Sequence, residues 1–378
     1  DRVVNECLKM LTEEKIRFIA KKVAEECAKS PDNLTAKALK NAIREADTAI
    51  ENLWKAIEQG QAVEMLTDRL NKRMAEKAEL EAIRNDDKEM ESRFFDQLSF
   101  GTAGLRGTMG VGLYRMNVHV IRHATQAFAN VIKAEGEEAM KKGIAICFDC
   151  RNNSDKFAQI SADIFSANGI KVYLFDDLRP TPEVSFAIRH FGCQSGINIT
   201  ASHNPREYNG YKAYWDDGAQ VLAPHDTAII DEVNKVTVAD IKFKGNKDLI
   251  QIIGADVDKI YLDMVHSISI DPEVIKRQKD LSIVYTPLHG AGRVLIPSSL
   301  KEWGFENVNC VPEQMVKDGN FPTVVSPNPE NAEALSMAIA LAKKIDADIV
   351  MASDPDADRV GMACKDDKGE WVLINGNQ

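Results

Sequence analysis

Short apolar segments alternate with amphipathic segments along most of this chain, and no other feature restricts the possible folds as strongly. The first series comprises helical patterns at 118–134 and 157–168 and strand patterns at 143–148 and 171–175. The second comprises helical patterns at 257–267, 296–303 and 330–344 and strand patterns at 281–286, 308–311 and 349–352. Strands and helices in this order form mixed sheets with helices on both faces. The sequence therefore predicts two tandem α/β domains packed around a cleft.

Residues 1–90 have a different composition, rich in Ala, Glu, Lys and Leu and with Gly60 as the single glycine. The spacing of a coiled-coil seam appears at Leu39, Ile43, Ala46, Ile50, Leu53 and Ile57. Gln59-Gly60-Gln61 interrupts this pattern before a second helical pattern begins at Val63, which predicts an antiparallel helical hairpin. Ser30-Pro31-Asp32 separates the hairpin from an earlier predicted helix containing Leu8, Leu11, Ile16, Ile19 and Val23.

The domain boundaries are predicted from these changes in composition. We expect a coiled-coil-like helical extension over 1–90, a first α/β domain over 91–250 and a second over 251–378. The boundary near 250 falls in the polar, irregular segment 234–254. With 378 residues, of which 44% are hydrophobic, the chain is long enough for two or three domains with proper cores.

Charge and cysteine content narrow the environment and the partners. The formal net charge of −11 does not favour nucleic acid or an anionic membrane. The seven cysteines are scattered, with no secretory hydrophobic region before them, so we expect a cytoplasmic protein. Cys147 and Cys150 form a C-x-x-C pair, but a second pair that would complete a zinc site is missing. No run of about 18 apolar residues occurs, so no membrane-spanning segment is predicted.

The stretch after the predicted strand 196–199 carries the candidate nucleophile, Ser202. Asn204-Pro205 and Asn209-Gly210 predict two turns, which would bring Lys212 back towards Ser202 and His203. A nucleophile, an acid/base candidate and a cation would then share one small volume. The strained G-x-S-x-G turn of hydrolases is not formed, and an adjacent histidine is badly placed as a triad base. A surface loop without function would contain the same residue types, so that alternative stays open.

Three carboxylates at alternate positions, Asp354, Asp356 and Asp358, follow the predicted strand 349–352. Hard oxygen ligands that converge in a tight loop suit Mg²⁺ or Ca²⁺. The calcium-loop pattern fails, because its sixth position is Arg359 and its twelfth is Lys365. A solvated acidic turn is the alternative, although the carboxyl end of a strand is where open α/β sheets bind ligands.

A glycine-rich segment, 101–112, would let backbone N–H groups approach an anion, and Arg106 within it can hold phosphate bidentately. No dinucleotide-binding or P-loop pattern is formed there, so a nucleotide-binding function has little support. His289, in Thr286-Pro-Leu-His-Gly, either lines the cleft or hydrogen-bonds loop carbonyls.

Together these stretches resemble the α-D-phosphohexomutases. Five motifs occur in order: F-G-T-A-G-L-R-G at 100–107, T-A-S-H-N-P at 200–205, Y-N-G-Y-K at 208–212, T-P-L-H-G at 286–290 and D-P-D-A-D-R at 354–359. The sequence is most similar to the phosphoglucomutase/phosphopentomutase branch, and the resemblance covers about residues 91–378. In that family Cys150 would replace a serine of a D-S-R motif. The resemblance implies two tandem phosphohexomutase-type α/β domains after the helical extension.

The resemblance also implies a mechanism. Phosphorylated Ser202 would give its phosphoryl group to a sugar monophosphate, the sugar bisphosphate would turn round, and the other phosphoryl group would return to the serine. Mg²⁺ would be held by Asp354, Asp356, Asp358 and an oxygen of the Ser202 phosphate. Arg106 and Arg359 would hold the phosphoryl group. His203 and Lys212 are the acid/base candidates, with Lys212 preferred if a cationic cleft lowers its pKa. A sugar 1,6-bisphosphate would serve as activator.

Two departures from the family pattern shape the functional expectation. The family's third domain, with its sugar-reading loop, and its fourth, with a second phosphate site, have no counterpart in these 378 residues, so we expect a truncated chain with weak or no turnover. Residues 1–90 more faintly resemble the coiled-coil tail of large serine recombinases, and their use is self-association or none. The alternatives are a non-catalytic sugar-phosphate-binding module and an interaction protein that acts through the N-terminal helices. The preferred sugar is not predicted.

Overall fold

The structure is a computed structural model that describes residues 31–58, 63–96, 98–101, 104–374 and 376. The helix predicted around residues 8–23 lies outside the described residues. The chain divides into two compact units. The first comprises residues up to 97 together with 111–115 and contains three helices among its described residues, and the second comprises 98–110 and 116–378. Each unit is described by itself.

The helical unit is built from a hairpin and a short third helix. Its helices are α3 (Pro31–Glu58), α4 (Val63–Ala82) and α5 (Asp87–Phe94). Lys77 of α4 forms an ion pair with Asp47 of α3 at 2.7 Å, while Leu39, earlier in α3, shares a buried cluster with Leu80, later in α4. The two helices therefore run antiparallel, as predicted. The Asp86 side chain caps α5 by accepting a hydrogen bond from the N–H of Glu89.

The second unit contains two sheets, the first of which has six strands in the order β1-β5-β4-β2-β3-β6. Strands β4, β2, β3 and β6 are parallel, whereas β5 runs antiparallel to both β4 and β1. The strands are β1 (Gly104–Thr108), β2 (Ile144–Phe148), β3 (Val172–Phe175), β4 (Ser195–Ile199), β5 (Tyr208–Trp215) and β6 (Ile250–Ile253). The first sheet thus extends as far as Ile253.

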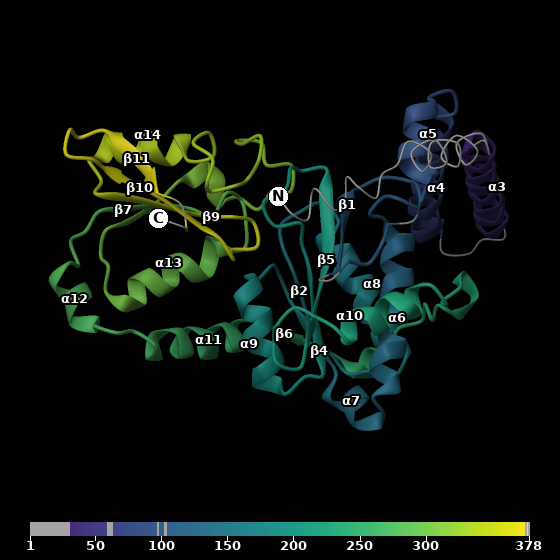
Figure 1. Ribbon diagram of the computed structural model, residues 1–378, viewed down its shortest axis with the longest axis horizontal. Coiled ribbons are helices and arrows are strands. Elements are labelled where there is room, and N and C mark those ends of the chain that lie inside the picture. The colour runs from purple at the N-terminus through teal and green to yellow at the C-terminus, as the bar shows by residue number, and fades with distance from the viewer. Residues whose placement is uncertain (1–30, 59–62, 97, 102–103, 375, 377–378) are drawn as a thin grey trace, which may run out of the picture. The chain divides into compact units, whose positions relative to one another are not determined.

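Helices cover both faces of this sheet, and the pleat of β2 explains why. Ile144, Ile146 and Phe148 belong to the core cluster on one face, whereas Ala145 and Cys147 belong to the cluster on the other. Helix α9 covers one face, and α6, α8 and α10 lie towards the other (Figure 1). The helices are α6 (Val118–Ala134), α7 (Glu137–Lys142), α8 (Ser154–Ala167), α9 (Thr181–Phe191) and α10 (His225–Val233), with short 3-10 turns η1 (Val238–Asp240) and η2 (Lys247–Leu249).

The second sheet has five strands in the order β11-β10-β9-β7-β8, with β7 parallel to β8 and β9. Helices α13 and α14 lie on opposite faces of it (Figure 1). The elements are α11 (Ala255–Ser267), α12 (Pro272–Arg277), β7 (Ile283–Thr286), α13 (Gly292–Trp303), β8 (Val308–Cys310), η3 (Pro312–Met315), α14 (Ser336–Ile345), β9 (Ile349–Ser353), β10 (Val360–Lys365) and β11 (Trp371–Ile374). The predicted architecture of two mixed α/β sheets after a helical region is confirmed.

The turn predicted at Asn209-Gly210 is wrong, because both residues lie inside strand β5. The Asn209 amide is buried and donates to the carbonyl of Asn152 and the hydroxyl of Ser154. A Cβ atom at position 210 would come within 2.4 Å of the Thr200 carbonyl oxygen. The glycine therefore permits close approach of the serine-bearing strand end, which is a different use from a turn.

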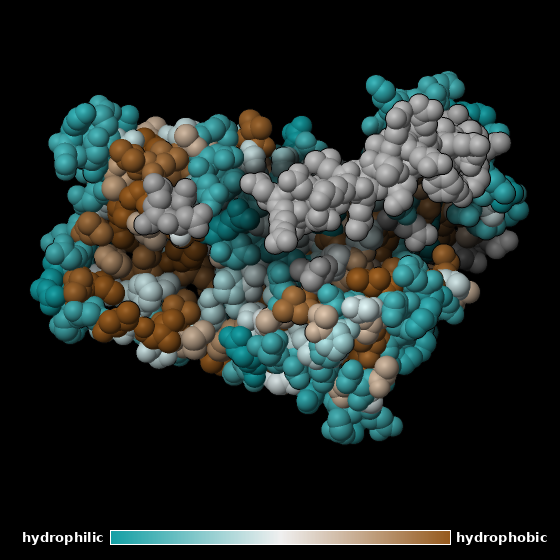
Figure 2. Space-filling model, in the orientation of Figure 1, coloured by the Kyte–Doolittle hydropathy of each residue, from teal (hydrophilic) through white to brown (hydrophobic). Residues whose placement is uncertain are grey.

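The glycine-rich segment was predicted to be a loop, but its part Gly104–Thr108 forms β1 and pairs with β5. Within the described residues no helix is long and apolar enough to cross a membrane. The face shown in Figure 2 carries apolar side chains around α12 and α13. Ile270, which precedes α12, Val274 of α12 and Val294 of α13 are exposed.

Candidate active site

The loop after β4 holds Ser202 in a constrained conformation. Ser202 has a φ of 53°, in the left-handed region that side chains other than glycine rarely adopt. Its N–H donates to the Thr200 hydroxyl at 2.8 Å, and the Asn204 N–H donates to the Ala201 carbonyl at 3.1 Å. The side chain is only 3% exposed. These bonds fix the backbone of the loop at Ser202.

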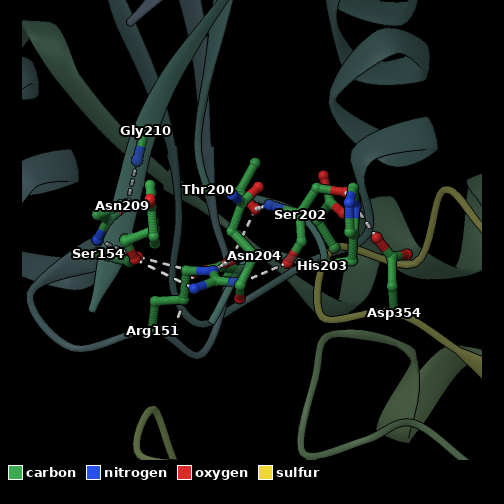
Figure 3. Close-up of polar contacts among 12 residues, drawn as sticks. Arg151, Ser154, Thr200, Ser202, His203, Asn204, Asn209, Gly210 and Asp354 are labelled. Atoms are coloured by element: carbon green, nitrogen blue, oxygen red, sulfur yellow. Dashed lines mark hydrogen bonds and ion pairs between the residues drawn. The ribbon is translucent and has the colours of Figure 1, made fainter. Parts of the chain in front are cut away.

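Arg151 holds the loop from one side. This residue follows β2, the parallel neighbour of β4, so the two strand ends meet at one edge of the sheet. Its guanidinium donates to the carbonyl oxygens of Ser202 at 2.6 Å, Pro205 at 2.8 Å and Tyr208 at 3.1 Å, and also to that of Asn204. Figure 3 shows Arg151 on one side of Ser202 and Asp354 on the other. The buried guanidinium of Arg151 thereby fixes the backbone of the loop.

Asp149 anchors this arrangement from beneath. Its carboxylate forms an ion pair with Arg151 Nε at 3.2 Å and accepts hydrogen bonds from the hydroxyls of Thr200, at 2.6 Å, and Ser154, at 2.8 Å. Burial raises the pKa of Asp149, although Arg151 acts in the opposite direction. The charge is therefore stable only while its partners remain in place.

The acidic loop after β9 meets Ser202 directly. The Ser202 hydroxyl donates to Asp354 Oδ2 at 2.7 Å, and the Arg359 N–H donates to Asp354 Oδ1 at 3.1 Å. Asp354 and Asp356 are fully buried, and Asp358 is exposed. One carboxylate oxygen from each of the three residues lies within 4.8 Å of the others. The structure thus brings together the serine and the acidic cluster, which are 152 positions apart in the chain.

This donor set fits a divalent cation. Burial, followed by the charges of Asp356 and Asp358, raises the pKa of Asp354 well above its ordinary range. Asp356 Oδ1 is buried and has no hydrogen-bond partner among the described residues. A small divalent cation coordinated by carboxylate oxygens would neutralise the repulsion and use this oxygen. The oxygen-only chemistry of the set suits a hard cation such as Mg²⁺, Ca²⁺ or Mn²⁺.

Lys212 lies in β5 and reaches the same cluster. Its ammonium donates to Asp356 Oδ2 at 2.6 Å and to Asp358 Oδ2 at 3.0 Å. Although burial acts the other way, these carboxylates raise the pKa of Lys212 above its ordinary value. In this arrangement Lys212 is a fixed positive charge beside the acidic loop.

The remaining predicted site residues surround Ser202. His203 Nδ1 lies 3.2 Å from the Ser202 hydroxyl oxygen, and burial, together with Arg359 and Arg106, lowers the pKa of His203. Arg106, in β1, donates to the side-chain oxygen of Asn204 at 3.1 Å. Arg106 and Arg359 are both exposed. All the predicted site residues thus fall around one locus, with two exposed guanidinium groups available to an anion.

Comparison with known proteins decides the family. The profile described as phosphoglucomutase/phosphomannomutase, alpha/beta/alpha domain I, matches residues 97–240, and that described as domain II of the same family matches 259–369. The chain belongs to the phosphoglucomutase/phosphomannomutase family. It is 38% identical to human phosphopentomutase over 302 residues, which cover 77% of this chain and 49% of that protein.

Further relatives agree with this assignment to a family of isomerases. A phosphoglucomutase of Staphylococcus haemolyticus (strain JCSC1435) is 38% identical over 290 residues, covering 76% of this chain and 52% of that protein. The chain therefore spans about half the length of the curated relatives it matches. A crystal structure of a phosphoglucomutase/phosphomannomutase family protein from Burkholderia thailandensis shares the fold, with a TM-score of 0.57, 24% identity, and coverage of 73% of this chain and 56% of that one.

Three residues that hold the Ser202 loop were not among the predicted site residues: Asp149, Arg151 and Thr200. Each of them follows a predicted strand in the sequence. Their partners, however, include backbone carbonyls and hydroxyls that only the fold brings near. His289, by contrast, is 1% exposed, and its two ring nitrogens lie 2.8 Å from the carbonyl oxygen of Val316 and the hydroxyl of Thr323. It satisfies loop groups and does not line the site.

Proposed function

We propose that the two α/β domains of this chain form the phosphoserine and metal-binding halves of a phosphosugar mutase. The reaction is an intramolecular phosphoryl transfer on sugar 1-/6- or 1-/5-phosphates, of the phosphoglucomutase or phosphopentomutase type. One observation carries the proposal: the Ser202 hydroxyl donates to Asp354 at 2.7 Å, so a hydroxyl that could carry phosphate lies against a carboxylate cluster suited to a divalent cation.

Each residue of the site has a separate proposed role in phosphoryl transfer. Ser202 carries the phosphoryl group, and the Arg151 clamp keeps its loop rigid so that the group is presented in one direction. Arg106 and Arg359 flank the loop and hold phosphate oxygens by bidentate hydrogen bonds. His203 and Lys212 are the acid/base candidates for the sugar hydroxyl, and the lowered pKa of His203 keeps its imidazole neutral. Lys212 adds fixed positive charge beside the acidic loop.

Asp354, Asp356 and Asp358 would hold Mg²⁺ together with an oxygen of the Ser202 phosphate. When bound, the cation withdraws charge from the phosphoryl oxygens during transfer. A sugar 1,6-bisphosphate is the activator that would place the first phosphoryl group on Ser202. The work of the protein is thus positioning and charge neutralisation.

Intact mass measurement tests the proposal. We expect the purified chain, incubated with glucose 1,6-bisphosphate and Mg²⁺, to gain the mass of one phosphoryl group, and peptide mapping to place it on Ser202. Ser202→Ala should gain none. Ser326→Ala is the matched control, because the Ser326 hydroxyl lies near the loop but donates to a backbone carbonyl, that of His203, at 3.0 Å. Phosphorylation of the Ser202→Ala chain to the same extent would refute the assignment.

The cellular setting and assembly are further parts of the proposal. We place the enzyme in the cytoplasm, acting on a small sugar phosphate. Self-association through residues 1–90 stays a prediction, supported by the half-exposed Trp54 and Met74 on the hairpin. Sedimentation velocity over a range of protein concentrations tests it, and a single monomeric species throughout would contradict it.

A further inference from the structure

The hydroxyl of Thr181 contacts the acidic loop from the other domain. Thr181 is the first residue of α9, between Pro180 and Pro182, and it is almost completely buried. Its hydroxyl donates to Asp356 Oδ2 at 2.7 Å, and its backbone N–H donates to the Asp356 carbonyl at 2.7 Å. The start of α9, which packs against the first sheet, is thereby joined to a loop at the edge of the second.

The same hydroxyl has a second partner that fixes its direction. Asn198 Nδ2 donates to Thr181 Oγ1 at 2.7 Å, so the hydroxyl must use its single hydrogen towards Asp356. Asn198 lies in β4, two residues before Thr200, and is the register partner of Lys212 in β5. Asn198, Thr181 and Asp356 therefore form a directed chain of hydrogen bonds.

The two oxygens of Asp356 end up in different states. Oδ2 accepts from both Thr181, at 2.7 Å, and Lys212, at 2.6 Å. Oδ1 is buried and has no hydrogen-bond partner among the residues that the structure describes. A carboxylate held in this way by one oxygen cannot rotate freely, and its other oxygen keeps its lone pairs for a ligand.

We infer that Thr181 is a positioning residue for the divalent cation: it holds Asp356 Oδ2, so that Oδ1 is presented to the cation. This inference rests on the proposed function, because it requires that the acidic loop binds a metal. Partners that orient metal-ligating side chains change metal affinity by about 10- to 100-fold when they are removed. The effect belongs to affinity and is separable from catalysis.

Titration with Mn²⁺, with free Mn²⁺ measured by electron paramagnetic resonance, tests the inference without any assay of turnover. We expect Thr181→Val, which keeps the shape and the backbone bond but lacks the hydroxyl, to bind Mn²⁺ about tenfold or more weakly than the unmodified chain. Thr181→Ser, which restores the hydroxyl, should bind within about threefold of the unmodified chain, since the orienting hydrogen bond returns. Thr181→Ala is a second variant without the hydroxyl, should Thr181→Val fail to fold.

Thr125→Val is the matched control. Thr125 is fully buried in the same domain, and its hydroxyl lies 3.2 Å from that of Ser161, in a contact that does not involve the acidic loop. We expect this variant to lose some thermal stability and to keep its Mn²⁺ affinity. Equal Mn²⁺ affinity of Thr181→Val or Thr181→Ala and the unmodified chain would overturn the inference alone. Failure of the unmodified chain to bind Mn²⁺ would overturn the proposed function and the inference with it.

Discussion

The loops that follow β4 and β7 begin in the same way and end differently. In each, a threonine at the strand end accepts a hydrogen bond from the backbone two residues later: Thr200 from Ser202 at 2.8 Å, and Thr286 from Leu288 at 3.1 Å. In each, the threonine hydroxyl also donates at 2.6 Å, to Asp149 in the first loop and to Gln314 in the second.

The partner of the threonine separates the two loops. Asp149 is charged and recruits Arg151, which clamps the loop by its carbonyls and leaves the Ser202 hydroxyl to face Asp354 of the other sheet. Gln314 is neutral and donates to Thr323, which also contacts His289, so the second network closes on itself. The same strand-end geometry therefore supports a charged site in one sheet and a neutral structural hydrogen-bond network in the other.

The dependence of the serine loop on the opposite sheet gives the largest expected effect. Asp354→Asn keeps the shape of the side chain but removes a ligand charge, and a metal of this kind contributes several kcal/mol to transition-state stabilisation. We expect phosphorylation of Ser202 by a sugar bisphosphate to slow by more than about 100-fold. Asp348→Asn, at a carboxylate that accepts from the Ser282 N–H, is the control and should leave the rate unchanged. A rate near that of the unmodified chain for Asp354→Asn would show that the two sheets do not share one site.

Because the partner of Thr200 is a buried carboxylate, we expect the loop after β4 to lose more stability than the loop after β7 when its network is broken. Arg151→Met removes the clamp and leaves the buried Asp149 carboxylate without its ion pair, which costs about 3–5 kcal/mol of the free energy of unfolding. Urea unfolding followed by circular dichroism measures the loss. A decrease below about 1 kcal/mol, the size expected of an ordinary hydrogen bond, would contradict the role given to the clamp.

A substitution in the loop after β7 should lower stability without slowing phosphorylation of Ser202. His289→Leu leaves the Val316 carbonyl and the Thr323 hydroxyl without this partner, and we expect a loss of about 1–3 kcal/mol in the free energy of unfolding. Phosphorylation of Ser202 should proceed at an unchanged rate at a temperature where the variant is folded. A stable His289→Leu chain that fails to accept phosphate would place His289 in the site and remove the contrast between the loops.

The smallest expected effect concerns His203, beside Ser202. Burial and the two nearby arginines lower its pKa, so the folded chain keeps this imidazole neutral. As the pH falls below about 6.5, the unfolded chain takes up a proton at this position before the folded chain does, and the free energy of unfolding declines. The nuclear magnetic resonance titration of the His203 ring should have its midpoint below about 6.5. A midpoint above that value would mean that burial and the nearby arginines do not lower the pKa of His203.

Much of the fold could be predicted because its signals are local. The helix over 118–134 was predicted with the bounds that the structure gives to α6, and the strand at 171–175 lies within one residue of β3. The carboxyl ends of parallel strands also explain why Ser202 and the acidic loop, each placed after a predicted strand, could be nominated as sites before the fold was known.

The parts that could not be predicted depend on distant partners. Nothing near Arg151 in the sequence indicates that it bonds carbonyls more than 50 positions later. Asn209-Gly210 has the composition of a turn, but its glycine serves the close approach of Thr200 from another strand. The preference for Lys212 as acid/base assumed a cationic cleft, whereas its ammonium lies between the carboxylates of Asp356 and Asp358, which only the fold brings near.

The most direct test of a shared site is pulsed electron paramagnetic resonance on the chain phosphorylated at Ser202 and loaded with Mn²⁺. If the Ser202 phosphate and the carboxylates of Asp354, Asp356 and Asp358 surround one cation, the spectrum will contain a hyperfine coupling between manganese and phosphorus. That coupling should disappear after removal of the phosphate. A bound Mn²⁺ ion without any phosphorus coupling in the phosphorylated chain would mean that serine and acidic loop serve separate sites.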